Sequence, residues 1–418
     1  MARGPSEEMS LRTLHAYVLL GILALLLCGA ARAEDDVRRV GPVPPKLRST
    51  WKLDRFYEKH LDLHGFPILG SKKVSDHALL EAAWIIDHML AGRRDVLAAL
   101  VKAKVRCCVM AHDEMTTDVP EHKTLEPGKW WDRRARGLGP SVERPCISCA
   151  EENLLGFPGD PYATENILVH EFAHAIDLMG LRTVDEDFEK KLTLAFNAAM
   201  KQGLWKDLYA AQNKEEYWAE GVQCWFDTNR PPDAIHNHVD TRAELVAYDP
   251  RLATLIGDHL GRLGWRYVEP RARAEPGHLA GHDPSKAPRF AWPEGLDDWY
   301  RRYEEAKRTG EGREDLEPLP AQGPPARSPT SLLETRVLFL NETDGVVELF
   351  WIDHEGNRRS YGTVTARSSA ERTTLVGHVW VVTDAQGLDL ARFVAATKPS
   401  RARIRPARAE TARSQGGR

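Results

Sequence analysis

Residues 164–180, TENILVHEFAHAIDLMG, carry two histidines four positions apart and a glutamate directly after the first. On a helix, His170 and His174 lie one turn apart, about 6 Å along the axis, and share one face. Both imidazoles can therefore reach one Zn²⁺ at roughly 2.0–2.1 Å. Glu171 projects beside them, where it can hold a metal-bound water and accept its proton. The alternative is a helix with two histidines on a polar stripe, because H-E-x-x-H fixes only three residues.

A zinc site of this kind needs a third ligand. Asp177 stands where a glycine would begin a histidine-bearing turn, and no histidine follows until His236. Downstream, NKEEYWAEGVQCWFD offers Glu216 and Glu220, at i and i+4 on an expected helix. Two like charges at this spacing are mildly destabilising by themselves. The pair makes sense if Glu216 binds the metal and Glu220 accepts the outer N–H of a metal-bound histidine.

Two alternatives remain for the third ligand. Asn213 and Glu216 fit a capping box, in which the carboxylate would bond to the backbone instead of a metal. That reading leaves Glu220 without a role. Glu215 is the fallback ligand, although its i+4 neighbour is Ala219.

HEFAHAID, followed about forty residues later by EYWAE, resembles the gluzincin class of zinc metallopeptidases over about residues 153–227. In that class the third ligand is a glutamate on a second helix, which implies His170, His174 and Glu216 as ligands. Neprilysin-like members share the aspartate three residues after the second histidine, which implies an outer-sphere role for Asp177. In lethal-factor-like members a tyrosine seven residues before the third ligand stabilises the transition state. This implies Tyr209, for which packing as a half-buried aromatic is the alternative.

The resemblance implies a mechanism of peptide hydrolysis. Zn²⁺ lowers the pKa of its water towards ~7 and polarises the scissile carbonyl. Glu171 accepts the proton and passes it to the leaving amine. Tyr209 would donate a hydrogen bond to the oxyanion. His236 and His238, in AIHNHVDTR, are second candidates for that role, and plain loop histidines are the alternative.

The scaffold for these residues is expected over residues 51–270, which read as a mixed α/β region. Apolar residues recur at helical spacing over 78–90, and 104–110 and PCISCAEENLL each suggest a buried strand. Thr164 can cap the metal-binding helix and Gly180 can end it. Together with the resemblance, this predicts an α+β zincin-like metallopeptidase domain over residues 34–270.

Composition and the N-terminus bear on where the protein acts. The 418 residues are 42% hydrophobic and 28% charged with a net charge of −4, which is ordinary for soluble domains and does not indicate a nucleic-acid binder. Arg3 and Arg12 precede an apolar run, 16–31, and Ala-Arg-Ala at 31–33 has the form of a signal-peptidase site. The run is shorter than the ~20 residues of a spanning helix. We therefore expect a signal peptide, residues 1–33, and export to the periplasm or outside the cell; an uncleaved anchor is the alternative.

Six cysteines are present, and cleavage after residue 33 removes Cys28. Four of the others cluster in the sequence: Cys107, Cys108, Cys146 and Cys149. In an oxidising compartment they predict disulfide bonds of undetermined pairing, each contributing about 3–4 kcal/mol by closing a loop. In the cytosol they would suggest structural zinc. Cys224 lies in a helical pattern and is expected to be a buried thiol.

Residues 271–330 are rich in Pro, Gly and charge and predict a linker with one helix over 296–308. From 331 to 400, short alternating strands separated by turn signals predict an all-β module. Residues 401–418 are rich in arginine and predict a disordered basic tail. Asn341 begins a glycosylation sequon, which matters only in a eukaryotic secretory pathway.

RVLFLNETDGVVELFWIDHEGNRRSYGTV and TTLVGHVWVVTDAQG resemble the von Hippel–Lindau β-domain, a small sandwich that binds hydroxyproline-containing peptides, over about residues 336–393. The resemblance implies a peptide pocket formed by Trp351, Tyr361, Thr374, His378 and Trp380. Thr373 and Leu375 replace a histidine and a tyrosine of the pattern, which bears on the ligand more than on the fold. The alternative is that the aromatics are sandwich core, because strand alternation places His378 and Trp380 on one face.

The sequence therefore predicts an exported zinc metallopeptidase with one Zn²⁺ per chain and a C-terminal β-sandwich that binds a peptide or protein. A non-catalytic zinc- and peptide-binding protein and a zinc hydrolase of a non-peptide bond are the alternatives. Glu171 favours an enzyme, because a structural zinc site needs no base.

Overall fold

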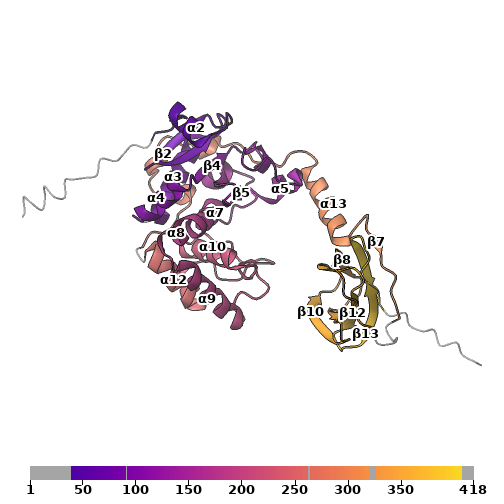
Figure 1. Ribbon diagram of the computed structural model, residues 1–418. Coiled ribbons are helices and arrows are strands. Elements are labelled where there is room, and N and C mark those ends of the chain that lie inside the picture. The colour runs from indigo at the N-terminus through magenta and orange to yellow at the C-terminus, as the bar shows by residue number, and fades with distance from the viewer. Residues whose placement is uncertain (1–38, 91, 262–263, 321–325, 407–418) are drawn as a thin grey trace, which may run out of the picture. The chain divides into compact units, whose positions relative to one another are not determined.

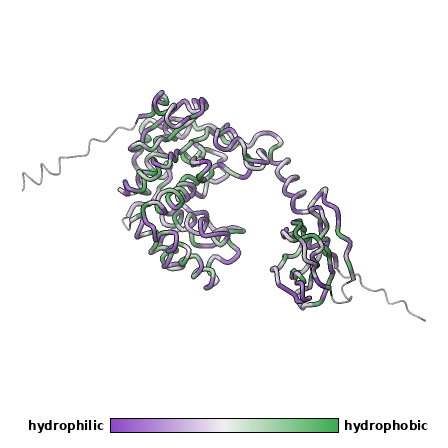
Figure 2. The backbone as a smooth tube through the Cα atoms, viewed as in Figure 1, coloured by the Kyte–Doolittle hydropathy of each residue, from purple (hydrophilic) through white to green (hydrophobic). Residues whose placement is uncertain are grey.

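The computed structural model describes residues 39–90, 92–261, 264–320 and 326–406. The chain divides into two compact units, Met1–Trp292 and Pro293–Arg418 (Figure 1). Hydrophobic and hydrophilic residues are interleaved along both units (Figure 2), as expected where each element has one buried face. No described helix is long and apolar enough to cross a membrane. The expected signal peptide, 1–33, lies outside the described residues.

A six-stranded mixed sheet forms the centre of the first unit, in the order β1-β2-β3-β4-β6-β5. The strands are β1 (Gly41–Pro42), β2 (Lys59–Leu63), β3 (Phe66–Gly70), β4 (Arg106–Met110), β5 (Gly137–Leu138) and β6 (Cys146–Ala150). β3, β4 and β6 are parallel, whereas β5 pairs antiparallel with β6 at one edge. Parallel neighbours need a crossover, which α3 (Asp76–Leu90) and α4 (Arg94–Lys102) supply between β3 and β4. The strands and the helix expected near 78–90, 104–110 and 145–155 are thus present.

Alternate residues of β4 and β6 face two different cores. Cys107 and Cys149 pack with α3, α4 and the helix α7 (Ile167–Ala175) on one face. On the other face Cys108 and Cys146 pack with Tyr57. α10 (Lys214–Trp225) packs on α7. The other helices of the unit are α2 (Pro45–Trp51), α5 (Gly128–Arg134), α6 (Glu151–Leu155), α8 (Arg182–Val184), α9 (Phe188–Lys201), α11 (Arg242–Tyr248) and α12 (Pro250–Leu260).

The clustered cysteines are buried free thiols, so the disulfide prediction was wrong. In the β4–β6 register Cys107 lies opposite Ile147 and Cys108 opposite Ser148, which leaves the cysteines on diagonal positions. A diagonal of two residues across neighbouring strands spans about 8 Å. Disulfide-bonded residues have Cα atoms roughly 4.4–6.8 Å apart. The prediction of a buried thiol at Cys224 is confirmed.

The metal-motif helix begins and ends differently from the expectation. Asn166, not Thr164, is the N-cap of α7, and its side chain accepts a hydrogen bond from the Val169 amide at 3.1 Å. At its other end α7 runs into a π-helical segment, Ile176–Leu181, and then into α8. Gly180 lies inside that segment, where a Cβ would come within 2.7 Å of Val96 on α4. The glycine therefore permits close packing against α4 instead of ending the helix.

The segment expected to be a linker is largely built into the two units. Arg273 donates to the buried Glu81 at 2.8 Å, and the Phe290 amide donates to Pro158, so this part belongs to the first unit. The predicted helix is α13 (Leu296–Thr309), in the second unit. The strand β7 (Glu314–Asp315) also belongs to the second unit.

The second unit is a β-sandwich, as predicted. One sheet has the order β10-β9-β12-β13 and the other β11-β8-β14-β7. The strands are β8 (Glu334–Asn341), β9 (Val347–Ile352), β10 (Arg358–Val364), β11 (Ser369–Leu375), β12 (Val379–Asp384), β13 (Asp389–Val394) and β14 (Ser400–Ile404). β14 takes up the first residues of the expected basic tail, and Arg401 donates to Asp315 at 2.5 Å. Residues 407–418 lie outside the described part.

Candidate metal centre and aromatic cluster

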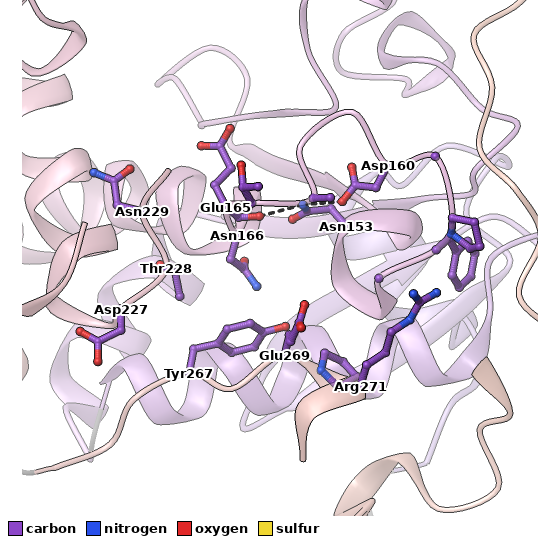
Figure 3. A pocket seen from close by; sticks show the side chains of 17 residues that line it. Asn153, Asp160, Glu165, Asn166, Asp227, Thr228, Asn229, Tyr267, Glu269 and Arg271 are labelled. Carbon is purple, nitrogen blue, oxygen red and sulfur yellow. Dashed lines mark hydrogen bonds between the residues drawn. The ribbon is translucent and has the colours of Figure 1, made fainter. Parts of the chain in front are cut away.

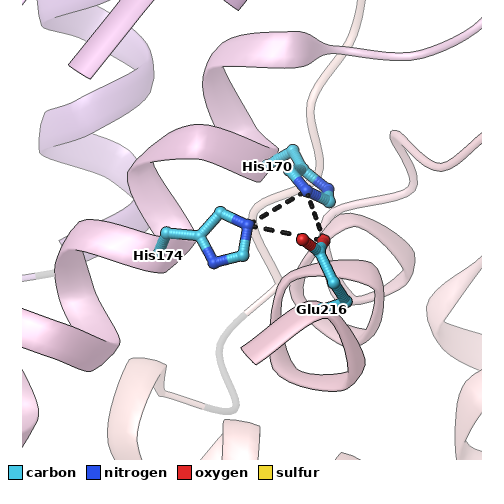
Figure 4. A group of neighbouring side chains, drawn as sticks. All are labelled: His170, His174 and Glu216. Atoms are coloured by element: carbon cyan, nitrogen blue, oxygen red, sulfur yellow. Dashed lines mark hydrogen bonds and ion pairs between the residues drawn. The ribbon is translucent and has the colours of Figure 1, made fainter. Parts of the chain in front are cut away.

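Three side chains from two helices converge in the first unit (Figure 4). His170 Nε2 lies 3.2 Å from Glu216 Oε2 and 3.2 Å from His174 Nε2, and His174 Nε2 lies 3.5 Å from Glu216 Oε2. Ligand atoms placed tetrahedrally at roughly 2.0–2.1 Å from a Zn²⁺ stand about 3.3 Å from one another. The spacing and the N₂O donor set therefore suit one such ion.

Gln223, which sequence reasoning missed, orients His170. Its Oε1 lies 2.8 Å from His170 Nδ1, and its Nε2 faces the Asn166 carbonyl and Glu165 Oε2 at 3.4 Å each. Because an amide nitrogen donates and its oxygen accepts, Nδ1 must carry a proton, and Nε2 is the ring nitrogen that faces the triad. Glu220, expected in this role, stands 3.7 Å from Nδ1 and accepts from Asn229 at 3.1 Å. Gln223 could have been found at i+7 from Glu216, on the same helix face.

Glu216 takes part in the helix cap through its backbone and in the triad through its carboxylate. Its backbone N–H donates to the Asn213 side chain at 2.8 Å, so Asn213 caps α10. Its carboxylate instead reaches the two histidines, so only half of a capping box is formed. Glu215 points elsewhere and accepts from Arg182 at 3.0 Å. The helix register thus brings Glu216, not Glu215, to the histidines.

Asp177 is fully buried and accepts two hydrogen bonds from Arg182, at 2.7 and 2.9 Å. Because Arg182 also reaches Glu215, this ion pair ties the end of α7 to the first turn of α10. Asp177 therefore acts on the triad through Arg182, by holding the two helices together.

Charge in the triad favours a cation. Burial alone would lower the pKa of His170, but the hydrogen bond to Glu216 and the charges of Glu171, Glu216 and Glu220 raise it to about 10. Burial would raise the pKa of Glu216, yet its bonds to His170 and His174 hold it far below the usual range. A centre that retains a proton so strongly has an excess of negative charge that a metal ion can also neutralise.

Glu171 lies beside the triad under the edge of the sheet. A Cβ on Gly139 would come within 3.2 Å of Glu171 Oε2 and 3.1 Å of His174 Cβ, so the chain after β5 passes directly over both residues. Burial raises the pKa of Glu171. A carboxylate with a raised pKa is better matched to accepting a proton near neutral pH.

A cavity of about 370 Å³ opens over the triad. Its walls come from the β5 edge, from α5 and from aromatic side chains, namely Trp130, Trp131, Tyr162 and Tyr209. The Tyr209 ring lies 6.3 Å from that of His170, and burial raises the pKa of its phenol, which therefore remains a hydrogen-bond donor.

The two histidines considered as alternatives to Tyr209 lie outside the lining of this cavity. His236 is buried behind Tyr209, with its ring 6.1 Å from the tyrosine ring and Nδ1 2.8 Å from Asp233. His238 is exposed and packs against Tyr248 at 5.8 Å. Of the three candidates, Tyr209 is the one that lines the cavity.

A second cavity in this unit, about 480 Å³, lies at the start of α7. Figure 3 shows Asn166 directed towards Tyr267, with Asp160 and Arg271 along one side. Burial raises the pKa of Asp160 to about 6. The triad residues do not line this cavity.

The second unit contains a cluster of aromatic rings, the aromatic cluster, around Trp351, Tyr361 and His378. The Trp351 ring lies 5.1 Å from His378 and 6.5 Å from Tyr361, and Tyr361 is 44% exposed. Thr374 Oγ1 lies 3.1 Å from His378 Nδ1. In the part of the chain that the structure describes, His378 Nε2 is buried without a hydrogen-bond partner. Trp380 is 1% exposed and packs with Phe339, so it is sandwich core, as the alternative reading expected.

Residues 326–393 match the family model of the VHL beta domain. The sandwich of the second unit is similar to that domain. No curated protein matches the chain. The matched stretch includes every residue of the aromatic cluster in this VHL-like module.

Asn341, the sequon residue, lies inside the VHL-like module and is fully buried. Its Nδ2 donates to the carbonyls of Gly345, Val364 and Thr365 at 2.8, 3.1 and 2.9 Å. The amide nitrogen to which a glycan would attach is thus engaged in the fold, and the folded module cannot carry a glycan there.

Proposed function

We propose that the first unit is a zinc-dependent peptidase of an exported protein, with one Zn²⁺ held by His170, His174 and Glu216. The observation that supports this most is the triangle of ligand atoms, 3.2–3.5 Å on each side, beside the half-buried Glu171. When bound, the metal would polarise a substrate carbonyl and acidify water. Export rests on the apolar run 16–31 alone.

The chain's own residues have separate tasks in this proposal. Glu171 accepts a proton from the attacking water and delivers it to the leaving amine. Gln223 holds His170 in the tautomer that leaves Nε2 free for the metal. Tyr209 donates a hydrogen bond to the oxygen that becomes negative.

The sheet edge favours a peptide over other substrates. β5 is the last strand of the six-stranded sheet, and its Gly137 and the following Gly139 line the triad cavity. An extended peptide can pair with the edge strand of a sheet through backbone hydrogen bonds, which would lay its carbonyls across the triad. A zinc hydrolase of a non-peptide bond would make no use of this edge.

The test is metal content together with hydrolysis of a mixed peptide library. Wild type should hold one zinc per chain and cleave peptides. Glu171→Gln should keep the zinc and lose about 10²–10⁴-fold in kcat/KM, because the base is not a ligand. A zinc-loaded wild type that cleaves nothing would favour a non-catalytic zinc-binding protein, and loss of zinc from Glu171→Gln would contradict the assignment of its role.

We further propose that the VHL-like module binds a peptide containing hydroxyproline. The supporting observation is the aromatic cluster, in which the buried His378 Nε2 has no hydrogen-bond partner among the described residues. A ring hydroxyl could satisfy that nitrogen, and a proline peptide would leave it unpaired at a cost of roughly 1–3 kcal/mol. Calorimetry with matched proline and hydroxyproline peptides tests this. Equal affinity, or binding unchanged by His378→Ala, would leave the module with another ligand.

A further inference from the structure

A cationic cavity of about 540 Å³ lies in the second unit, between α13 and the outer face of strands β8 and β11. Four basic and two acidic side chains line it: Lys307, Arg308, Arg313, Arg336, Glu304 and Glu371. Arg308 is bound to Glu305 on its own helix at 2.6 and 2.8 Å. The lining as a whole keeps an excess of positive charge, which attracts anions.

The fold places these groups on the side of the sheet away from the sandwich core. Val337 and Phe339 of β8 point into the core, so Arg336 and Leu338 point outward. In the strand register Glu371 lies opposite Leu338, and therefore on the same outer face. This face is distinct from the aromatic cluster, because Trp351, Tyr361 and His378 do not line the cavity.

Glu371 occupies the middle of the basic group. It forms an ion pair with Arg313 and lies 3.5 Å from Arg336, so one carboxylate serves two guanidinium groups. Among the described residues, Arg313 Nη1 is buried with no acceptor. Arginine has five N–H donors in a planar fork and prefers two-point contact with a carboxylate or phosphate. The arginine pair can therefore bind more acceptor oxygens than Glu371 supplies.

We propose that this cavity binds an acidic peptide segment, whose anionic side chain displaces Glu371 from Arg313 and Arg336. The cavity is much larger than a single inorganic anion, and the half-buried Tyr303 adds apolar surface for the rest of a peptide. Glu371 is 33% exposed at its side chain and can turn outward into solvent. The cavity shares no residue with the metal centre or with the aromatic cluster.

Fluorescence anisotropy on the full chain tests the site with four labelled peptides of one length. One contains alternating glutamates, one has glutamine at the same positions, and a serine peptide is used with and without phosphate. We expect the glutamate or the phosphoserine peptide to bind, and binding to weaken with added salt. The tighter of the two identifies the source of the anion as carboxylate or phosphate.

Three variants decide the role of the arginine pair. Arg336→Glu should weaken binding by about tenfold or more, since it removes a charge-assisted hydrogen bond. Glu371→Gln should strengthen it, because the competing carboxylate is gone. Arg301→Glu, a matched charge reversal on the exposed side of α13, should leave it unchanged. The proposal would be overturned if neither the glutamate nor the phosphoserine peptide bound more tightly than its uncharged control, or if Glu371→Gln bound more weakly than wild type.

Discussion

The triad of the first unit and the aromatic cluster of the second differ in how their polar atoms are arranged. In the triad, three ligand atoms from α7 and α10 converge to within 3.5 Å, and their charges are unbalanced without a cation. In the aromatic cluster, rings stand 5.1–6.5 Å apart. Trp380 Nε1, Thr374 Oγ1 and His378 Nδ1 form one hydrogen-bonded chain, whereas His378 Nε2 has no partner among the described residues. The first arrangement suits an ion and the second a flat ring with one polar group. Side chains of similar type, histidine above all, thus form different environments according to their spacing.

The largest effect is expected at the third ligand. Glu216→Ala should reduce zinc affinity by more than the ~10–100-fold typical of residues outside the ligand shell. Glu215→Ala is the matched control, because Glu215 bonds to Arg182 and not to the histidines. Titration with a competing chelator measures both. A chain that loses zinc with Glu215→Ala and keeps it with Glu216→Ala would contradict the register of α10.

Two aromatic substitutions distinguish the exposed rings of the aromatic cluster from the core of the sandwich. Trp380→Ala should destabilise the second unit by about 3–5 kcal/mol, because it opens a cavity in the sandwich core. Tyr361→Ala should change the unfolding free energy little, since this side chain is 44% exposed. Chemical denaturation followed by tryptophan fluorescence tests the difference. Similar losses from both variants would mean that Tyr361 is also structural.

Acid should weaken the first unit through His122, which is 2% exposed. Burial lowers the pKa of His122 to about 4, so the folded chain leaves it neutral where the unfolded chain, at about 6.5, takes up a proton. The free energy of unfolding therefore does not depend on His122 titration above about pH 6.5, and this titration lowers it by up to about 3 kcal/mol as the pH drops to 4.

The raised pKa of Asp160 opposes this trend, because the folded chain binds a proton there at a higher pH than the unfolded chain does. Unfolding free energies of wild type and His122→Gln should therefore be compared between pH 4 and 7. The wild type should lose more stability than the variant as the pH falls. Parallel curves would show that His122 does not carry the effect.

The smallest expected effect is the difference in zinc affinity between variants of Gln223 and Glu220. Gln223→Leu should lower zinc affinity about 10–100-fold, because His170 loses the acceptor that fixes its tautomer. Glu220→Ala should cost less, since its carboxylate stands 3.7 Å from His170 Nδ1. Metal affinity and the NMR signals of the His170 ring nitrogens distinguish the two. A greater loss from Glu220→Ala would restore the role that the sequence assigned to it.

Local pattern was enough to predict several features of this protein. The four-residue spacing of His170 and His174 places both on one face of any helix, and the i, i+4 pair of carboxylates identified the helix that meets it. Alternating strands and turn residues predicted the sandwich, and apolar periodicity predicted α3 and α13. These features depend on backbone geometry that repeats every two or 3.6 residues, so they can be read without knowing what lies opposite.

Other features depended on contacts between segments far apart in the chain. Gln223 instead of Glu220 meets His170 because of the way α10 packs across α7, and Gly180 is a packing residue because α4 crosses it. The strand register sets the cysteines on diagonals, and the fold of the module buries the amide of Asn341. Residues 271–292 belong to the first unit, where Arg273 forms an ion pair with the buried Glu81, 192 positions earlier in the chain. A side chain's partner is chosen by tertiary packing, which the periodicity of its own helix or strand does not encode.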